Sequence, residues 1–171
     1  MFENIAWCNS ENNAPHHLKN VSLVKGLPDF DNTENVPTLV VSDCVMDTAY
    51  STKVSQLISK GSHHRIISLV LITQNLFHEG PLSRDISLHS KYIVFKNPIV
   101  KKQIVHLARQ VYPENISSFH KTYLEVCKDL HTYLFLDLIQ SINDLLKYRT
   151  KIFPGESTEV FEVTFTFPPR P

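Results

Sequence analysis

Short apolar runs separated by polar segments are the first pattern along this chain. The runs are rich in β-branched and aromatic residues, and most of them are apolar on both faces. This pattern favours strands that are buried on both faces, as in a mainly parallel sheet covered by helices. Six runs have this character: residues 5–8, 21–24, 38–41, 66–72, 92–95 and 133–136.

Helical periodicity fills several of the intervals between these runs. Apolar residues recur three and four positions apart within residues 51–60, 99–112 and 116–130, and Pro113 separates the last two segments. Alternation of strands with helices predicts an α/β fold with right-handed crossovers. The apolar positions are Val54, Leu57 and Ile58, then Ile104, Leu107, Ala108 and Val111, and finally Ile116, Phe119, Tyr123, Val126 and Leu130.

The remaining segments are polar or differently patterned. Residues 9–17 and 27–37 are rich in polar residues and proline, which predicts surface loops. After Pro154, apolar residues alternate with polar ones from Phe161 to Phe167, which predicts a half-buried strand or an extension that borrows a sheet edge. We therefore expect one domain over residues 1–153 and a C-terminal extension over residues 154–171.

Charge and composition argue against several classes of protein. The formal net charge is zero, so any contact with DNA should be weak and local. A basic edge for such a contact could form from Lys60, Lys91, Lys96, Lys101 and Lys102, although the simpler interpretation is solvated lysines balanced by an equal number of acids. No apolar stretch is long enough for a membrane span, and the N-terminus does not resemble a secretory signal. Three widely spaced cysteines argue against a disulfide framework and favour a reducing compartment.

Two strand ends carry the candidate chemistry. Asp43 follows the run at residues 38–41, and Gln74 follows the run at residues 66–72. Ligands of open α/β sheets bind at the carboxyl ends of strands, where an aspartate can hold Mg²⁺ beside nucleotide phosphates and an amide can orient water or sense a γ-phosphate. The simpler interpretations are a turn-forming Asp43 and an ordinary polar strand end at Gln74. Because one helix joins the two strands, we expect Asp43 and Gln74 on neighbouring strands at one edge.

The order and spacing of several blocks resemble the packaging ATPases of the FtsK/HerA-like class found in Polinton (Maverick) elements and related DNA viruses. The blocks are residues 26–28, 37–43, 60–65, 71–78, 84–88, 92–98 and 107–113. The resemblance implies a three-layer, mainly parallel P-loop fold, truncated at its N-terminal βα unit. It also implies ATP and Mg²⁺ as cofactors, with Asp43 as the Walker B aspartate and Gln74 as the polar sensor. An intracellular location, nuclear or cytoplasmic, is a further implication of the resemblance.

The same resemblance suggests roles for two arginines. The sequence also differs from the family pattern at two points. Arg65 and Arg84 match positions that could reach a neighbouring subunit's nucleotide in a ring, although Arg65 could instead favour a helix C-terminus and Arg84 could be a solvated charge. The sequence has no G-x-x-x-x-G-K-[ST] loop, and Cys44 stands where the family has a second acid. The first strand of such sheets is central, so its absence should expose the edges of neighbouring strands.

These features predict a degenerate or incomplete DNA-packaging ATPase that does not hydrolyse ATP independently. The alternative is a non-enzymatic interaction module that keeps the ring-forming surfaces and docks onto intact ATPase subunits or other partners. The resemblance also implies a ring-type homo-oligomer. A third interpretation is an unrelated α/β nucleotide-binding protein. A metal site at the histidine pairs is disfavoured, because adjacent histidines point to different sides of an element. A thiol hydrolase built on Cys44 has no supporting local motif.

Overall fold

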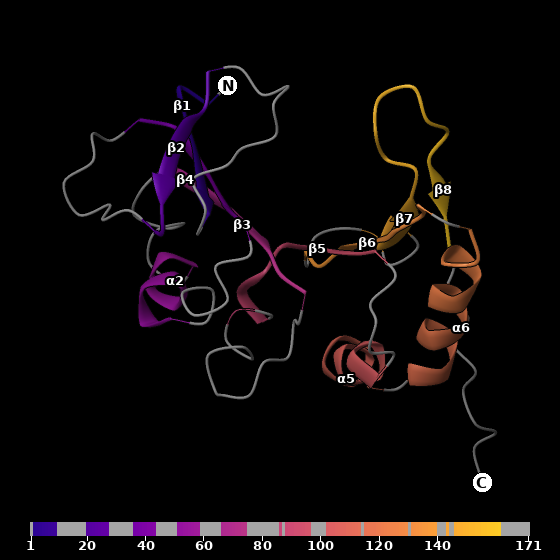
Figure 1. Ribbon diagram of the computed structural model, residues 1–171. Coiled ribbons are helices and arrows are strands. Elements are labelled where there is room, and N and C mark those ends of the chain that lie inside the picture. Colours follow the sequence, from indigo (N-terminus) through magenta and orange to yellow (C-terminus); the bar gives the residue numbers. More distant parts are fainter. Residues whose placement is uncertain are drawn as a thin grey trace, which may run out of the picture. The chain divides into compact units, whose positions relative to one another are not determined.

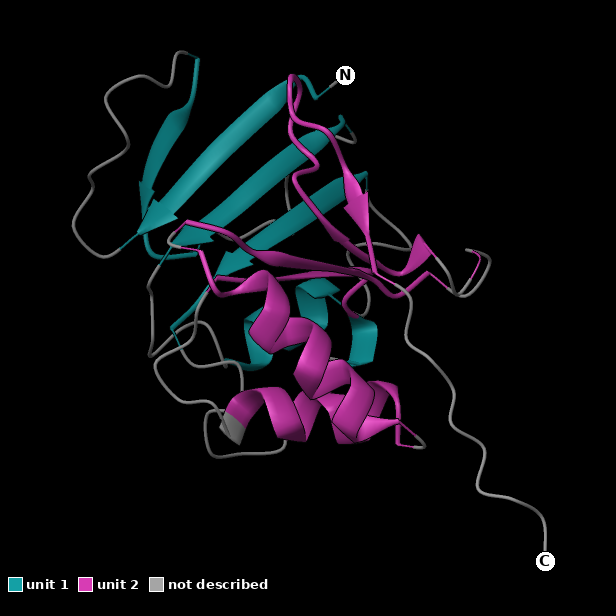
Figure 2. Cartoon of the chain, turned by 90° about the vertical axis from the view of Figure 1, so that its right-hand side faces the viewer, with its two compact units in different colours: residues 1–89 teal, residues 90–171 magenta. Residues whose placement is uncertain are grey.

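The chain divides into two compact units, Met1–His89 and Ser90–Pro171. The computed structural model describes residues 2–9, 20–27, 36–43, 51–58, 66–74, 86, 88–96, 102–113, 115–129, 131–139, 143 and 146–161. Each unit has one four-stranded sheet, parallel in the first and antiparallel in the second (Figures 1 and 2). The predicted boundary between residues 153 and 154 therefore falls within the second unit.

The first unit contains a parallel sheet with strand order β2-β1-β3-β4. Its strands and its helix α2 lie where the hydrophobic pattern predicted elements. They are β1 (Asn4–Asn9), β2 (Ser22–Lys25), β3 (Thr38–Asp43), α2 (Thr52–Gln56) and β4 (Ile67–Ile72).

The core of this unit lies on one face of the parallel sheet. Cys8, Val40 and Ile67 are buried together, and Leu57, directly after α2, packs against them. Helix α2 begins after Ser51, whose hydroxyl accepts a hydrogen bond from the Val54 N–H at 3.4 Å. The opposite face buries Val41 and Asn9 but leaves Leu23, Val70 and Ile72 exposed.

The second unit contains an antiparallel sheet with strand order β5-β6-β7-β8. The predicted single, mainly parallel sheet was therefore wrong for the strands after residue 90, although the mixed α/β class is correct. The strands are β5 (Tyr92–Phe95), β6 (Leu134–Asp137), β7 (Tyr148–Thr150) and β8 (Glu159–Val160). Strands β7 and β8 pair with each other, and the Phe161 N–H extends this ladder by donating to the Tyr148 carbonyl at 2.9 Å.

Two amphipathic helices in the second unit match the predicted apolar stripes. Helix α5 (Lys102–Val111) buries Ile104, Leu107 and Ala108, and α6 (Ile116–Val126) buries Phe119, Tyr123 and Val126. The Tyr148 ring of β7 lies 5.3 Å from the Tyr112 ring and 5.6 Å from the Phe119 ring. This aromatic cluster joins the helices to the buried face of the antiparallel sheet.

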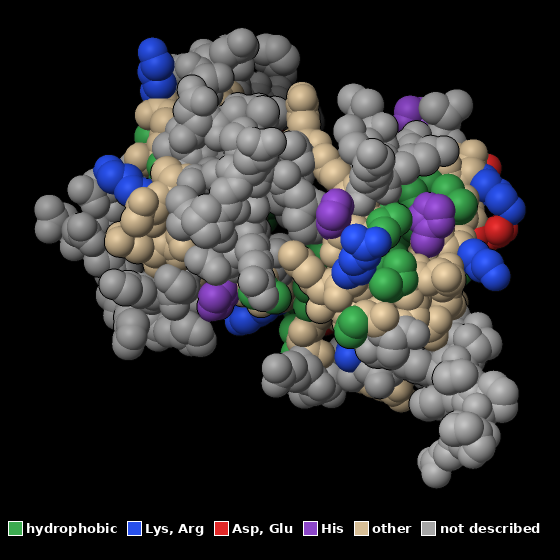
Figure 3. Space-filling model, turned by 90° about the horizontal axis from the view of Figure 1, so that it is seen from below, with side chains coloured by type: hydrophobic (Ala, Val, Ile, Leu, Met, Phe, Trp, Pro, Cys, Tyr) green, Lys and Arg blue, Asp and Glu red, His purple; other side chains and the backbone are tan. Residues whose placement is uncertain are grey.

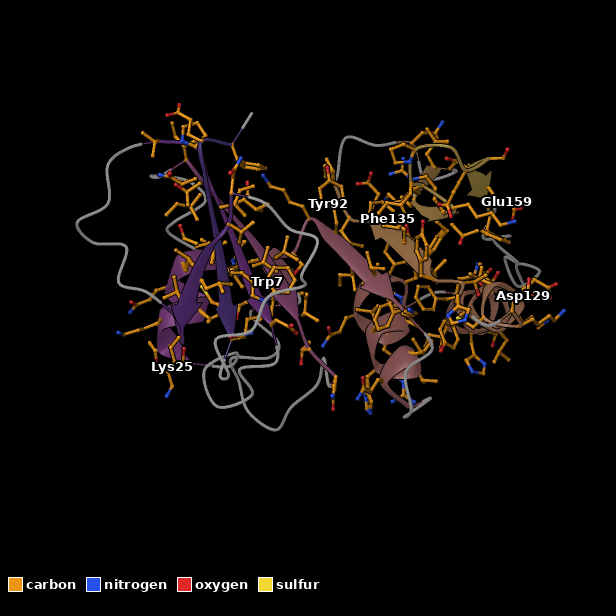
Figure 4. All side chains as sticks on the ribbon, turned by 45° about the horizontal axis from the view of Figure 1, so that its top comes forward. Trp7, Lys25, Tyr92, Asp129, Phe135 and Glu159 are labelled. Carbon is orange, nitrogen blue, oxygen red and sulfur yellow. The ribbon has the colours of Figure 1, made fainter. Side chains whose placement is uncertain are left out.

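The other face of the antiparallel sheet is only partly covered. Tyr92 and Val94 of β5 are exposed, and the Tyr92 ring lies 5.5 Å from the Phe135 ring of β6 (Figure 4). On this face Arg149 pairs with the buried carboxylate of Asp137, and its guanidinium also lies over the Phe135 ring. Full burial of β5 on both faces, as predicted from its apolar run, was therefore wrong.

Replacement of Tyr148 by Ala should destabilise the second unit by about 3–5 kcal/mol, because it removes a ring that is 1% exposed from the contact between β7 and the two helices. Urea unfolding followed by circular dichroism measures this loss. The matched control is Tyr92→Ala in the same sheet, where the ring is 51% exposed and the expected loss is about 1 kcal/mol. Equal losses for the two variants would contradict the described packing.

Candidate nucleotide-type site at the carboxyl edge of the parallel sheet

The predicted pair Asp43 and Gln74 lies at one edge of the parallel sheet. Strands β3 and β4 are parallel neighbours, and Asp43 is the register partner of Ile72. Gln74 follows Ile72 by two residues and is exposed, whereas Asp43 is partly buried. The prediction that these residues follow neighbouring strands is confirmed, and any chemistry they share must occur at this edge.

Two further polar residues reach the same edge, and the sequence pattern did not identify them. Asn9 is the last residue of β1 and pairs in register with Lys25, the last residue of β2 (Figure 4 labels Lys25). Asn9 is buried, so its assignment to a surface loop was wrong. The signal was weak because Asn9 directly precedes a long polar segment that dominates the local composition.

A glycine fixes the end of β2 at this edge. Gly26 has a φ of +73°, a left-handed conformation that glycine adopts without the strain of a side chain. In this conformation its N–H donates to the Asn9 carbonyl at 3.1 Å. The bond ties the carboxyl end of β2 to that of β1, and so places Lys25 beside Asn9.

Strand alternation places these polar residues on one face of the sheet. Cys8 and Ser42 are register partners on the face that holds the core, so the following residues, Asn9 and Asp43, belong to the opposite face. Ile72 shares that face as the partner of Asp43. The edge therefore presents one carboxylate, amides from Asn9 and Gln74, and the Lys25 ammonium.

This set of residues can supply only part of a magnesium–nucleotide site. Mg²⁺ in such sites is held by one or two carboxylates together with substrate phosphates, so Asp43 is a suitable ligand. The described residues contain no cluster of three or more His, Cys, Asp or Glu side chains that could hold a metal without a substrate. Phosphates would also need a cradle of backbone N–H groups, and the sequence has no loop of that type. The residues present therefore do not fit a self-sufficient ATP site.

Several predicted residues lie outside the described residues. These include Cys44, Arg65 and Arg84, so the geometry does not test a ring arginine or a degenerate acid position. Among the lysines proposed for DNA contact, the side chains of Lys91 and Lys96 are described, and both are exposed on either side of β5. Neither histidine pair is described.

Comparison of this chain with protein-family models, curated proteins and solved structures finds no match. Within the described part of the chain, no helix is long and apolar enough to cross a membrane.

Cys8, next to Asn9, is a buried free thiol in the core of the first unit. Burial raises the pKa of this thiol above its ordinary value, because the low-dielectric core disfavours the thiolate. The unfolded chain therefore releases this proton at a lower pH than the folded chain. Consequently the Cys8 contribution to stability is retained below the unfolded pKa and declines as the pH rises through that value.

Between pH 7 and pH 10, the free energy of unfolding should fall more steeply in the unaltered chain than in Cys8→Ala. The expected cause is loss of the Cys8 proton from the unfolded chain above about pH 8.5. Urea titrations at a series of pH values, in the presence of a reductant, measure the two slopes. Identical pH dependence would show that Cys8 is not desolvated in the folded chain.

Proposed function

We propose that this chain is a degenerate or incomplete DNA-packaging ATPase, similar to the FtsK/HerA-like class of Polinton elements and related DNA viruses, without independent ATP hydrolysis. The observation that carries the proposal is the parallel pairing of β3 with β4, which brings Asp43 and Gln74 to one carboxyl edge. This is the arrangement that a magnesium ligand and a γ-phosphate sensor require. In this proposal Asp43 would hold Mg²⁺ together with the phosphates of ATP, and Gln74 would sense the γ-phosphate.

An open edge of the parallel sheet supports the idea that this sheet lacks a strand. Within the described residues, β4 is an edge of the parallel sheet. It carries two exposed apolar side chains, Val70 and Ile72. Strands in the middle of an α/β sheet normally bury such residues, so β4 has the composition of an interior strand.

The absence of independent hydrolysis follows from the missing phosphate anchor. A phosphate-binding loop supplies backbone N–H groups and a lysine that hold the β- and γ-phosphates during transfer. These 171 residues have no such motif, and Cys44 occupies the position of the second acid in the resembled family. Any hydrolysis would therefore require intact subunits, with Arg65 or Arg84 acting on a neighbour's nucleotide in a ring.

The alternative function is a non-enzymatic interaction module of the same origin. The open, apolar edge of β4 favours it, because an exposed strand edge is a template for pairing with another chain. Intact ATPase subunits or further copies of this chain would then be the partners.

Weak DNA contact, if it accompanies either function, is best placed on the second unit. Residues 1–89 hold six Lys and Arg against nine Asp and Glu, whereas residues 90–171 hold eleven against eight. Arg109 of α5 and Lys121 of α6 are exposed. In the view of Figure 3, Lys, Arg and His side chains lie among hydrophobic ones on the right-hand part, with Asp and Glu side chains at its margin. The excess of basic residues favours a salt-sensitive contact with phosphates there.

A fluorescent ATP analogue should bind weakly, with a Kd of about 1 mM or higher, in a manner that requires Mg²⁺ and Asp43. Asp43→Asn should abolish this binding because it removes the only carboxylate among the described residues at the carboxyl edge. Glu3→Gln is the matched control, since Glu3 is an exposed acid just before β1 at the opposite edge. Phosphate release by the unaltered chain should equal the enzyme-free rate. Rapid, Asp43-dependent hydrolysis would disprove the proposal, and absence of any binding would favour the interaction module.

Gln74→Ala should remove any preference for the ATP analogue over the ADP analogue while leaving Mg²⁺-dependent binding of ADP unchanged. The reason is that the amide is positioned to detect only the γ-phosphate in the proposed site. Competition between the two analogues measures the preference. Retention of the preference in Gln74→Ala would remove the sensor role without affecting the role of Asp43.

A further inference from the structure

Strand β4 differs from the other sheet edges of the described residues. Edge strands are usually protected by charge, by proline or by short length. The other three edges have such protection: β2 has four residues and includes Lys25, β5 has four residues between Lys91 and Lys96, and β8 has two residues and includes Glu159. Strand β4 has six residues, Ile67–Ile72, with neither charge nor proline.

The hydrogen-bonding direction of each β4 residue follows from its pairing with β3. The Thr38 N–H donates to the Ile66 carbonyl at 2.8 Å, and Thr38 is the register partner of Ile67. In a parallel ladder, bonding groups alternate between the two sides of a strand. The backbone groups of even-numbered residues from 66 to 72 are therefore directed to β3. Those of Ile67, Leu69 and Leu71 are directed to the open edge.

We propose that the open edge of β4 pairs with the β4 edge of a second copy of this chain, antiparallel and centred on Leu69. A two-fold axis through Leu69 makes each outward-directed residue face an outward-directed residue of the other copy. Leu69 then faces Leu69, and Ile67 faces Leu71. In each of these facing pairs, the N–H and the carbonyl of one residue bond to the carbonyl and the N–H of the other, as in a hydrogen-bonded pair of an antiparallel sheet.

The same register matches the side chains on both faces. Ile67, Leu69 and Leu71 lie on the face that holds the core, so the two cores become continuous across the axis. On the opposite face, Ile66 lies beside Ile72 of the second copy, and Val70 lies beside Ser68. The three exposed hydrophobic residues of this segment, Ile66, Val70 and Ile72, are thus covered by one pairing.

Charge favours a second copy over other extended partners. In a two-fold interface each residue approaches the equivalent part of its own sequence, so any charge near the axis would meet a like charge. Residues 66–74 contain no charged side chain, and the formal net charge of the whole chain is zero. Neither the strand nor the chain as a whole therefore repels its copy.

Sedimentation equilibrium of the full chain in reducing buffer, between about 1 and 300 μM, tests the pairing. The average mass should rise with concentration from 19.7 kDa toward twice that value. Val70→Lys should weaken the dimer by about tenfold or more, because it places two like charges across the axis. Leu23→Lys should leave the dimer unchanged. Leu23 is 44% exposed and Val70 is 45% exposed, and both lie in the same row of the same face, but Leu23 belongs to the opposite edge.

Amide hydrogen exchange of the unaltered chain provides a second readout that does not depend on any variant folding. With rising concentration, exchange should slow at Ile67, Leu69 and Leu71, whereas the amides of Ser68, Val70 and Ile72 should already be slow. A mass of 19.7 kDa at every concentration would overturn the proposal. So would equal weakening by the two lysine variants, which would indicate packing through the sheet face instead of the edge.

Discussion

The parallel pairing of β3 with β4 is the constraint on which the rest of the first unit depends. Its register places Val40 beside Leu69 on the core face and Asp43 beside Ile72 on the other. A slip of one residue would exchange the faces of a strand, exposing Val40 and turning Asp43 toward the core. The Thr38 side chain helps to fix the start of β3, because its hydroxyl donates to the Val36 carbonyl at 3.0 Å. The register of β3 with β4 therefore determines both which side chains are buried and where the candidate site lies.

Element positions could be predicted from the sequence much better than sheet membership. The helices around Val54, Ile104 and Phe119 and the strands of the parallel sheet follow from local apolar spacing. Strand β7 was missed because it has three residues and mixed polarity, and its burial depends on the distant Tyr112 and Phe119 rings. Apolar residues on both sides of β4 and β5 predicted double burial, but burial also requires a covering element that a local pattern cannot specify.

The residues of the candidate site also differ in whether the local sequence could predict their positions. Asp43 and Gln74 could be predicted because each follows a strong apolar run, and one helix between parallel strands brings their ends together. Asn9 could not be predicted, because its burial comes from the pairing of β1 with β2 and β3 on either side. Such an edge positions polar groups well. Position alone does not hold a triphosphate, which needs several N–H donors directed at the same oxygen atoms.

A complete ATP site and the two-fold dimer require strands of opposite direction at the open edge of β4. A phosphate-binding loop follows the carboxyl end of a strand, so a strand that completed an ATP site beside Gln74 would have to run parallel to β4. The two-fold pairing instead places an antiparallel strand there, with its amino end near Ile72. It also puts the Asp43 edges of the two copies at opposite ends of the joined sheet. One edge cannot accept both strands at the same time, so self-pairing would exclude completion of the site and favour a binding role over catalysis.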